Sequence, residues 1–277
     1  MRLRLRHHLR VRFSEPTRNA ISILRMTPRS HEGQRVTNWR IDVEPDCLLK
    51  SGEDHFGNLT HTLTVPGIVS ELSITAQGEL TCFDAAGVVR GTAERLPLDI
   101  YRRDTATTMP SEELRSFASD VAAASDNDLG KLHQLLGAVH QRIATSSEPT
   151  AVVTADAAFK ACKGTSGDHA QIFATCARHL GFPARCAHGF YLDDDGQSTR
   201  HAWAEAYVDG LGWVGFDPVH DICPQDYHVR VAVGLDALDA AALRGTPGQN
   251  AAETVDVNWM FGLDQRRNAQ AATISFS

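Results

Sequence analysis

Polar and apolar residues alternate along most of the first ninety residues, and this pattern limits what that part of the chain can form. The alternation is clearest in four runs, residues 11–13, 36–43, 60–65 and 71–75. A period of two is that of a strand with one buried face. Proline and glycine fall between the runs, as at Pro16 and at Pro66-Gly67. We therefore expect short antiparallel strands packed as a β-sandwich.

The periodicity becomes helical after a connector at about residues 95–110. Acidic residues follow Ser111, and residues 129–143 place five apolar side chains on one helical face: Leu132, Leu135, Leu136, Val139 and Ile143. A third helix is expected from Ser166 to Leu180, because Gly181-Phe-Pro183 is a typical helix stop.

Strand patterns return beyond this third helix. They cover residues 184–191, 201–208 and 213–216, and Asp209-Gly-Leu-Gly212 predicts a hairpin between the last two. Residues 229–233 and 254–259 are expected to be closing strands. Helices followed by an antiparallel sheet indicate an α+β class. We predict two domains, an N-terminal β-sandwich over residues 1–95 and an α+β domain over residues 96–277.

Composition excludes several functional classes. The chain has 277 residues, 42% hydrophobic and 22% charged, with a net charge of -7, which disfavours a nucleic-acid partner. The first ten residues alternate basic and apolar side chains, a pattern that predicts a strand and not a signal peptide, and no apolar run of membrane-spanning length follows. We therefore expect a cytoplasmic protein without a membrane contact. The six cysteines show no C-x-x-C spacing, which fits neither a zinc ribbon nor a disulfide framework.

Three residues form a candidate catalytic set. Ser166 stands at the expected start of the third helix, where unpaired backbone N–H groups and the helix dipole favour negative charge. His201 opens one strand of the predicted hairpin, and Asp217 ends the other. Neighbouring antiparallel strands can hold these two side chains within hydrogen-bonding reach, so that the carboxylate fixes the imidazole tautomer.

The same segments carry a resemblance to a known family. Residues 164–173 (GTSGDHAQIF), 180–185 (LGFPAR), 201–203 (HAW) and 212–218 (GWVGFDP) resemble the core of the bacterial transglutaminase-like superfamily. Residues 24–28 (LRMTP) and 54–58 (DHFGN) resemble the N-terminal β domain of that family. The resemblance covers nearly the whole chain.

This resemblance implies a papain-like α+β core and a Cys-His-Asp triad that transfers an acyl group from an amide, through an acyl-enzyme, to water or an amine. The expected partner is a peptide, protein or small amide substrate, with an amine as a second acceptor. The expected chemistry uses no metal and no organic cofactor. In this scheme His201 is general base and then acid, Asp217 orients it, and the backbone N–H of Ser166 is an oxyanion donor.

The chain departs from the family at the nucleophile, where Ser166 occupies the place of the cysteine. A serine hydroxyl cannot store the anion that a thiol forms beside a histidine. Three interpretations remain open: an engineered Cys→Ser change, a natural serine that still attacks, or a natural pseudoenzyme that binds a peptide or partner protein without cleaving it. Cys162 precedes the helix and is not expected to substitute.

Two further residues have competing roles. Trp203 could line an acyl-binding groove, although aromatic residues in core strands more often provide packing. Asp168 could tune a substrate site, or it could stabilise the helix dipole from the first turn.

Overall fold

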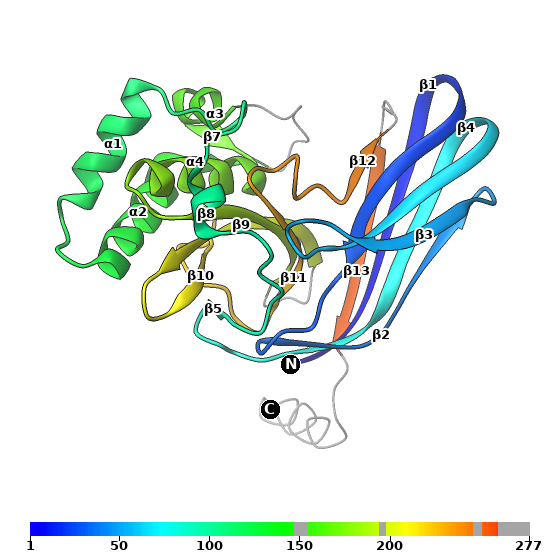
Figure 1. Cartoon of the computed structure of the whole chain (residues 1–277), viewed down its shortest axis with the longest axis horizontal. Helices are drawn as coiled ribbons and strands as arrows, with labels where there is room; N and C mark the ends of the chain where they lie inside the picture. Colours follow the sequence, from blue (N-terminus) through cyan, green and yellow to red (C-terminus); the bar gives the residue numbers. More distant parts are fainter. Residues whose placement is uncertain (147–153, 194–197, 246–250, 260–277) are drawn as a thin grey trace, which may run out of the picture.

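The molecule consists of a helical layer, a central antiparallel sheet and a curled N-terminal sheet (Figure 1). The computed structural model describes residues 1–146, 154–193 and 198–245, together with the backbone of 251–259. The α+β class predicted from the sequence is confirmed. In the part of the chain that the structure describes, no helix combines the length and apolarity needed to cross a membrane.

The central sheet is antiparallel, with strand order β11-β8-β9-β10-β5. Its strands are β8 (Ala184–Leu192), β9 (Ser198–Val208), β10 (Gly212–Phe216), β11 (His228–Gly234) and the short β5 (Val88–Val89). Strands β9 and β10 form the hairpin expected from the Asp-Gly-Leu-Gly joint, with Phe216 paired to Ala204.

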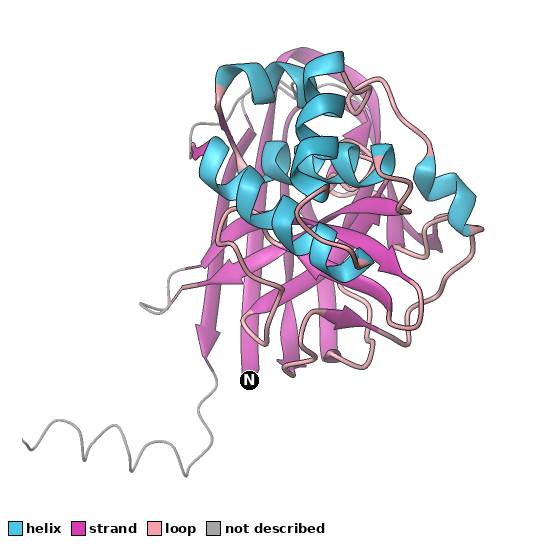
Figure 2. Cartoon of the chain, turned by 90° about the vertical axis from the view of Figure 1, so that its left-hand side faces the viewer, coloured by secondary structure: helices cyan, strands magenta, loops and turns pink. Residues whose placement is uncertain are grey.

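Helices lie together beside this sheet (Figure 2). They are α1 (Glu112–Ala122), α2 (Asp128–Arg142), α3 (Ala155–Ala161) and α4 (Ser166–His179), after a 3-10 turn, η1 (Leu98–Arg102). The predictions for α1, α2 and α4 are confirmed. Helix α3 was not predicted, because seven residues carry too short a pattern. A two-stranded parallel pair, β6 (Ala144–Thr145) and β7 (Lys163–Gly164), leads into α4.

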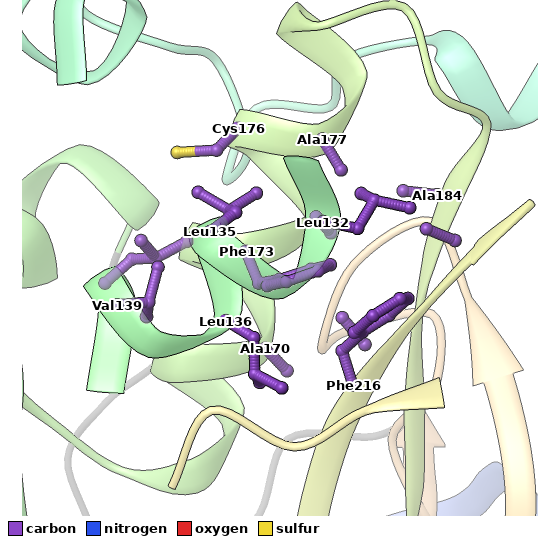
Figure 3. Close-up of a cluster of buried hydrophobic side chains, with 14 of the residues drawn as sticks. Leu132, Leu135, Leu136, Val139, Ala170, Phe173, Cys176, Ala177, Ala184 and Phe216 are labelled. Carbon is purple, nitrogen blue, oxygen red and sulfur yellow. The ribbon is translucent and has the colours of Figure 1, made fainter. Parts of the chain in front are cut away.

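The main hydrophobic core joins the helices to the central sheet. Leu132, Leu135 and Val139 of α2 meet Phe173 of α4, and Phe173 stacks on Phe216 with ring centroids 5.0 Å apart (Figure 3). The predicted apolar face of α2 is therefore the face that packs. This core fixes α4, and with it Ser166, against strands β8 to β10.

The N-terminal sheet is built on two long strands, β1 (Arg2–Thr27) and β4 (Leu59–Cys82). The sequence predicted shorter strands interrupted by proline, but both strands run on through Pro16 and Pro66. The β1–β4 register shifts between Arg12 and Thr17, around Pro16, and again between Arg18 and Ala20, opposite Pro66. Both prolines therefore lie at irregularities where a ladder hydrogen bond is already missing. The bends curl the sheet, which β2 (Gln34–Glu44) and β3 (Leu48–Glu53) extend.

The chain crosses between the two sheets more often than the predicted division at residue 95 implies. Strand β5 belongs to the central sheet. Strands β12 (Leu243–Gly245) and β13 (Ala251–Trp259) pair with β1. Residues 254–259, expected to close the second domain, thus extend the N-terminal sheet. The division into domains at residue 95 stays a prediction.

Two amide side chains dock the N-terminal region on β11. Asn58 donates to the carbonyl of Val233 and accepts from its N–H, at 2.7 and 2.8 Å. Gln34 makes the same pair with the backbone of Arg230, at 2.9 and 2.8 Å. Each amide acts as one residue of a neighbouring strand, so the N-terminal region holds β11 in place.

Candidate active site

The first turn of α4 is closed by a reciprocal cap around Ser166. Thr165 is the N-cap; its hydroxyl accepts from the N–H of Asp168, and the Asp168 carboxylate accepts from the Thr165 N–H at 2.8 Å. Ser166 is the first helical residue and is half-buried. The N–H groups of Ser166 and Gly167 donate to no group among the described residues. They are therefore available to an anion.

His201 and Asp217 form a buried pair on the β9–β10 hairpin. Their Nε2 and Oδ2 atoms are 2.7 Å apart, and the side chains are 5% and 0% exposed. The hairpin register explains this distance, because Asp217 directly follows Phe216, which pairs with Ala204 of β9. Since Nε2 faces the carboxylate, the lone pair of a neutral His201 ring lies on Nδ1, which has no hydrogen-bond partner among the described residues.

Two more histidines approach the same carboxylate oxygen. His220 Nδ1 lies 2.7 Å and His228 Nε2 lies 3.1 Å from Asp217 Oδ2. Neither histidine was predicted from the sequence as a site residue. His220 could have been noticed because it follows Asp217 by three residues in a turn, whereas His228 reaches the site only because β11 pairs with β8.

Proton positions in this cluster follow from the backbone. The N–H of Gln225 donates to Nδ1 of His228 at 3.1 Å, so the proton of a neutral His228 lies on Nε2 and points at Asp217. Burial lowers the pKa of His228, against the attraction of Asp217. Burial raises the pKa of Asp217, but the N–H donors of the three histidines outweigh it and hold that pKa well below its usual value. Asp217 is a carboxylate.

The last turn of α2 connects this cluster to the start of α4. His140 Nδ1 lies 3.1 Å from the carbonyl oxygens of Pro218 and Val219. One turn later, the carbonyl of Ile143 meets Nε2 of the buried His169 at 3.0 Å, and Nδ1 of His169 meets the Thr165 carbonyl at 2.9 Å. The α2 end thus touches both the loop after Asp217 and the cap before Ser166.

The lengths of α4 and β8 bear on where the start of α4 is expected relative to His201. Helix α4 has 14 residues, so it spans roughly 20 Å, the length of about six strand residues. The chain turns directly from α4 into β8, so a helix that runs antiparallel to β8 would begin near the level of Gly189 and Phe190. Gly189 pairs with His201 in β9. No hydrogen bond joins Ser166 to His201 among the described residues, so their joint action stays a prediction.

The two residues with competing roles are both buried. Trp203 is 2% exposed, with ring centroids 6.3 Å from His201 and 5.5 Å from His228. Asp168 is 5% exposed and is used in the Thr165 cap. Burial favours packing for Trp203 and helix capping for Asp168, and their substrate-binding roles stay predictions.

A hollow of about 520 Å³ lies away from this cluster, on the N-terminal sheet. Arg4, Arg6, Trp39 and Arg40 are among the residues that line it. Ser166, His201 and Asp217 do not border it. The convergence of polar side chains, and not the size of a hollow, marks the candidate active site.

Comparisons with known proteins match two regions of the chain to family models. A family model described as the bacterial transglutaminase-like N-terminal region matches residues 3–81. A second model, described as the transglutaminase-like superfamily, matches residues 115–218, a range that includes Ser166, His201 and Asp217. An uncharacterized protein of Mycobacterium leprae is 24% identical over 290 residues, which cover 92% of this chain and 96% of that protein.

A solved structure shows the same fold. The crystal structure of a proposed cysteine protease from Cytophaga hutchinsonii matches with a TM-score of 0.74 and 18% identity, over 93% of this chain and 89% of the other. The periplasmic domain of TgpA from Pseudomonas aeruginosa matches with 15% identity over 78% and 90% of the two chains, but its TM-score of 0.38 is too low to carry an argument. With both family models matched in order, the chain carries a core of the transglutaminase-like superfamily over residues 115–218, preceded by the bacterial transglutaminase-like N-terminal region over residues 3–81.

Proposed function

We propose that this protein transfers an acyl group from an amide or ester carbonyl, with Ser166 as the attacking residue, His201 as general base and then acid, and Asp217 as the group that orients His201. The observation that carries the proposal is the buried His201–Asp217 pair. It points the N–H of His201 at a carboxylate and leaves a lone pair on Nδ1 for the nucleophile's proton.

The start of α4 supports the same chemistry. A carbonyl attacked by Ser166 develops negative charge on its oxygen, and unpaired N–H groups at a helix start stabilise such an oxyanion. The Ser166 N–H is one donor of this kind. The acyl group then passes to water or to an amine, and the chemistry of this site is compatible with a peptide, protein or small amide donor in the cytoplasm.

Serine in place of cysteine lowers the expected rate. A thiol has a free pKa near 8.5 and is partly ionised beside a histidine, whereas a hydroxyl must lose its proton during attack. By analogy with the loss of a triad nucleophile, the cost is on the order of several powers of ten. The second candidate function is therefore a binding module that holds a peptide or partner protein in the same place without cleaving it. An engineered Cys→Ser change is the remaining alternative.

Restoring the thiol tests this proposal. The test compares Ser166→Cys and Ser166→Ala, both in a Cys162→Ser background, because Cys162 is exposed and would otherwise react. Burial raises the pKa of Cys176 and Cys186 to about 12, so these thiols stay silent. We expect the thiol introduced by Ser166→Cys to be alkylated by iodoacetamide faster than an ordinary surface thiol, and this variant to release product from a panel of peptide and ester substrates.

Each outcome separates the alternatives. Activity in both the serine and cysteine proteins, absent from Ser166→Ala, supports a serine nucleophile. Activity in the cysteine protein alone supports an enzyme inactivated by serine at position 166, or a binding module. The codon at position 166 in the native gene then separates an engineered change from a natural one. An introduced thiol with no more than the reactivity of a surface thiol contradicts acyl transfer on this scaffold.

A further inference from the structure

The cluster around Asp217 holds more nitrogen ligands than an acyl-transfer triad uses. His201, Asp217 and His220 each offer one ligand atom, and these three atoms lie within 4.8 Å of one another. His220 Nδ1 is as close to Oδ2 as His201 Nε2 is, at 2.7 Å. One base needs one imidazole on its carboxylate, so the triad leaves His220 without a role.

The charge and the surroundings of the cluster suit a cation. Asp217 carries a negative charge with 0% exposure, and among the described residues its side chain meets only three imidazoles and the N–H of Val219, which donates to Oδ1. His220 is 31% exposed and provides a path from solvent. Tyr191 stacks on its ring with centroids 4.0 Å apart, which limits how the imidazole can turn.

We propose that His201, Asp217 and His220 form a binding site for a zinc-like divalent ion, one that prefers imidazole nitrogen and carboxylate oxygen. Two histidines and a carboxylate are a common zinc ligand set, and a water completes four-coordination. His228 lies 3.1 Å from the same oxygen and acts from outside the ligand set, holding the carboxylate in orientation.

Metal binding requires a small rearrangement that the site can make. Bonds of about 2.1 Å to a tetrahedral ion place ligand atoms about 3.4 Å apart, so the 2.7 Å contacts must widen by about 0.7 Å. His220 lies in the turn after β10 and can supply this movement. Each neutral imidazole moves its proton to its other ring nitrogen, so Nε2 of His201 and Nδ1 of His220 become ligands with no net loss of protons.

This rearrangement would prevent His201 from acting as the proposed catalytic base. With the proton of His201 on Nδ1, that nitrogen can no longer accept a proton from residue 166. The inhibitory consequence rests on the proposed function, whereas metal binding itself does not. Binding can therefore be measured without turnover.

Calorimetry of the metal-free full chain with Zn²⁺ tests the site. We expect about one ion per chain for the wild type. His220→Asn should weaken binding at least about 100-fold, because it removes a direct ligand, and His228→Gln should weaken it about 10-fold to 100-fold, as expected of an outer contact. His179→Asn is the matched control, since His179 is an exposed histidine at the end of α4, and it should leave binding unchanged.

Titration of the wild type with Co²⁺ gives a readout that needs no variant. Strong visible bands of four-coordinate Co²⁺, displaced by Zn²⁺, support the site. Absence of saturable Zn²⁺ binding, or equal losses in His220→Asn and His179→Asn, would overturn the proposal and leave a purely hydrogen-bonded cluster. Zn²⁺ binding by the wild type, together with an unreactive thiol in the Ser166→Cys variant, would uphold the metal site and refute acyl transfer.

Discussion

Glu205 should be one of the most stabilising charged residues of the protein. Its carboxylate is 0% exposed and accepts from Arg230 at 2.6 and 3.0 Å and from Arg185 at 2.7 Å. Arg185 is itself fully buried and lies 3.8 Å from the Trp213 ring centroid. Replacement of Glu205 by glutamine keeps the shape but removes the charge that two arginines share.

The size of the effect follows from two independent quantities. Removal of one partner from a buried ion pair costs about 3–5 kcal/mol. Burial raises the pKa of Glu205, but Arg230 and Arg185 outweigh it and lower the pKa from 4.5 to about 2. At about 1.4 kcal/mol per pKa unit, that difference corresponds to about 3 kcal/mol. The two values agree that Glu205→Gln should lower the free energy of unfolding by about 3–5 kcal/mol at pH 7.

The pH dependence provides a second, sharper check. A carboxylate whose pKa is lowered in the folded state stabilises the protein above the unfolded pKa of 4.5, and this contribution is lost as the pH falls toward 2. The difference in free energy of unfolding between the wild type and Glu205→Gln should therefore decrease by about 2 kcal/mol between pH 7 and pH 3.

Urea unfolding followed by tryptophan fluorescence measures both effects, and Trp213 reports directly on the cluster. Glu71→Gln is the control, because Glu71 pairs with Arg10 and Arg12 at the surface and should leave the unfolding midpoint unchanged. Equal stabilities of wild type and Glu205→Gln at pH 7, or a gap that stays constant down to pH 3, would refute the reasoning.

Four further substitutions test the rest of the fold. Burial and the nearby Arg230 lower the pKa of His31 from 6.5 to about 4, so the wild type should lose stability as the pH falls from 6.5 to 4. In His31→Gln the melting midpoint should depend less on pH between 6.5 and 4. An unchanged pH dependence would show that another titratable group causes the loss of stability. Asn58→Leu leaves both backbone groups of Val233 without their partners. It should lower the free energy of unfolding in urea by about 2–4 kcal/mol and speed hydrogen exchange at the Val233 amide. Unchanged exchange would contradict the docking role of Asn58. A Cβ at Gly189 would lie 1.9 Å from the Val229 carbonyl, but at Gly137 of α2 its nearest neighbour is 3.6 Å away. Gly189→Ala should therefore lower the melting midpoint while Gly137→Ala raises it, and the same sign in both would count against the packing argument.

Local patterns in the sequence were enough to predict the elements that carry the candidate site. The apolar spacing of α2, the stop after α4 and the Asp-Gly-Leu-Gly hairpin each depend on residues a few positions apart. The hairpin also accounts for the 2.7 Å contact of His201 and Asp217, because the two strands that hold them are joined by one short turn. Interactions of this kind are set by helix and strand geometry, which periodicity reflects directly.

Contacts between distant segments depended on the tertiary structure. Gln34 meets Arg230 across 196 positions, and Asn58 meets Val233 across 175. No local spacing signals such pairs. The same holds for His228, which joins Asp217 only because β11 pairs with β8. The sequence by itself determined where Ser166, His201 and Asp217 stand on their elements. The packing of β11 and the turn after β10 decided that one carboxylate is surrounded by three histidines, because burial of an anion favours every donor that can reach it.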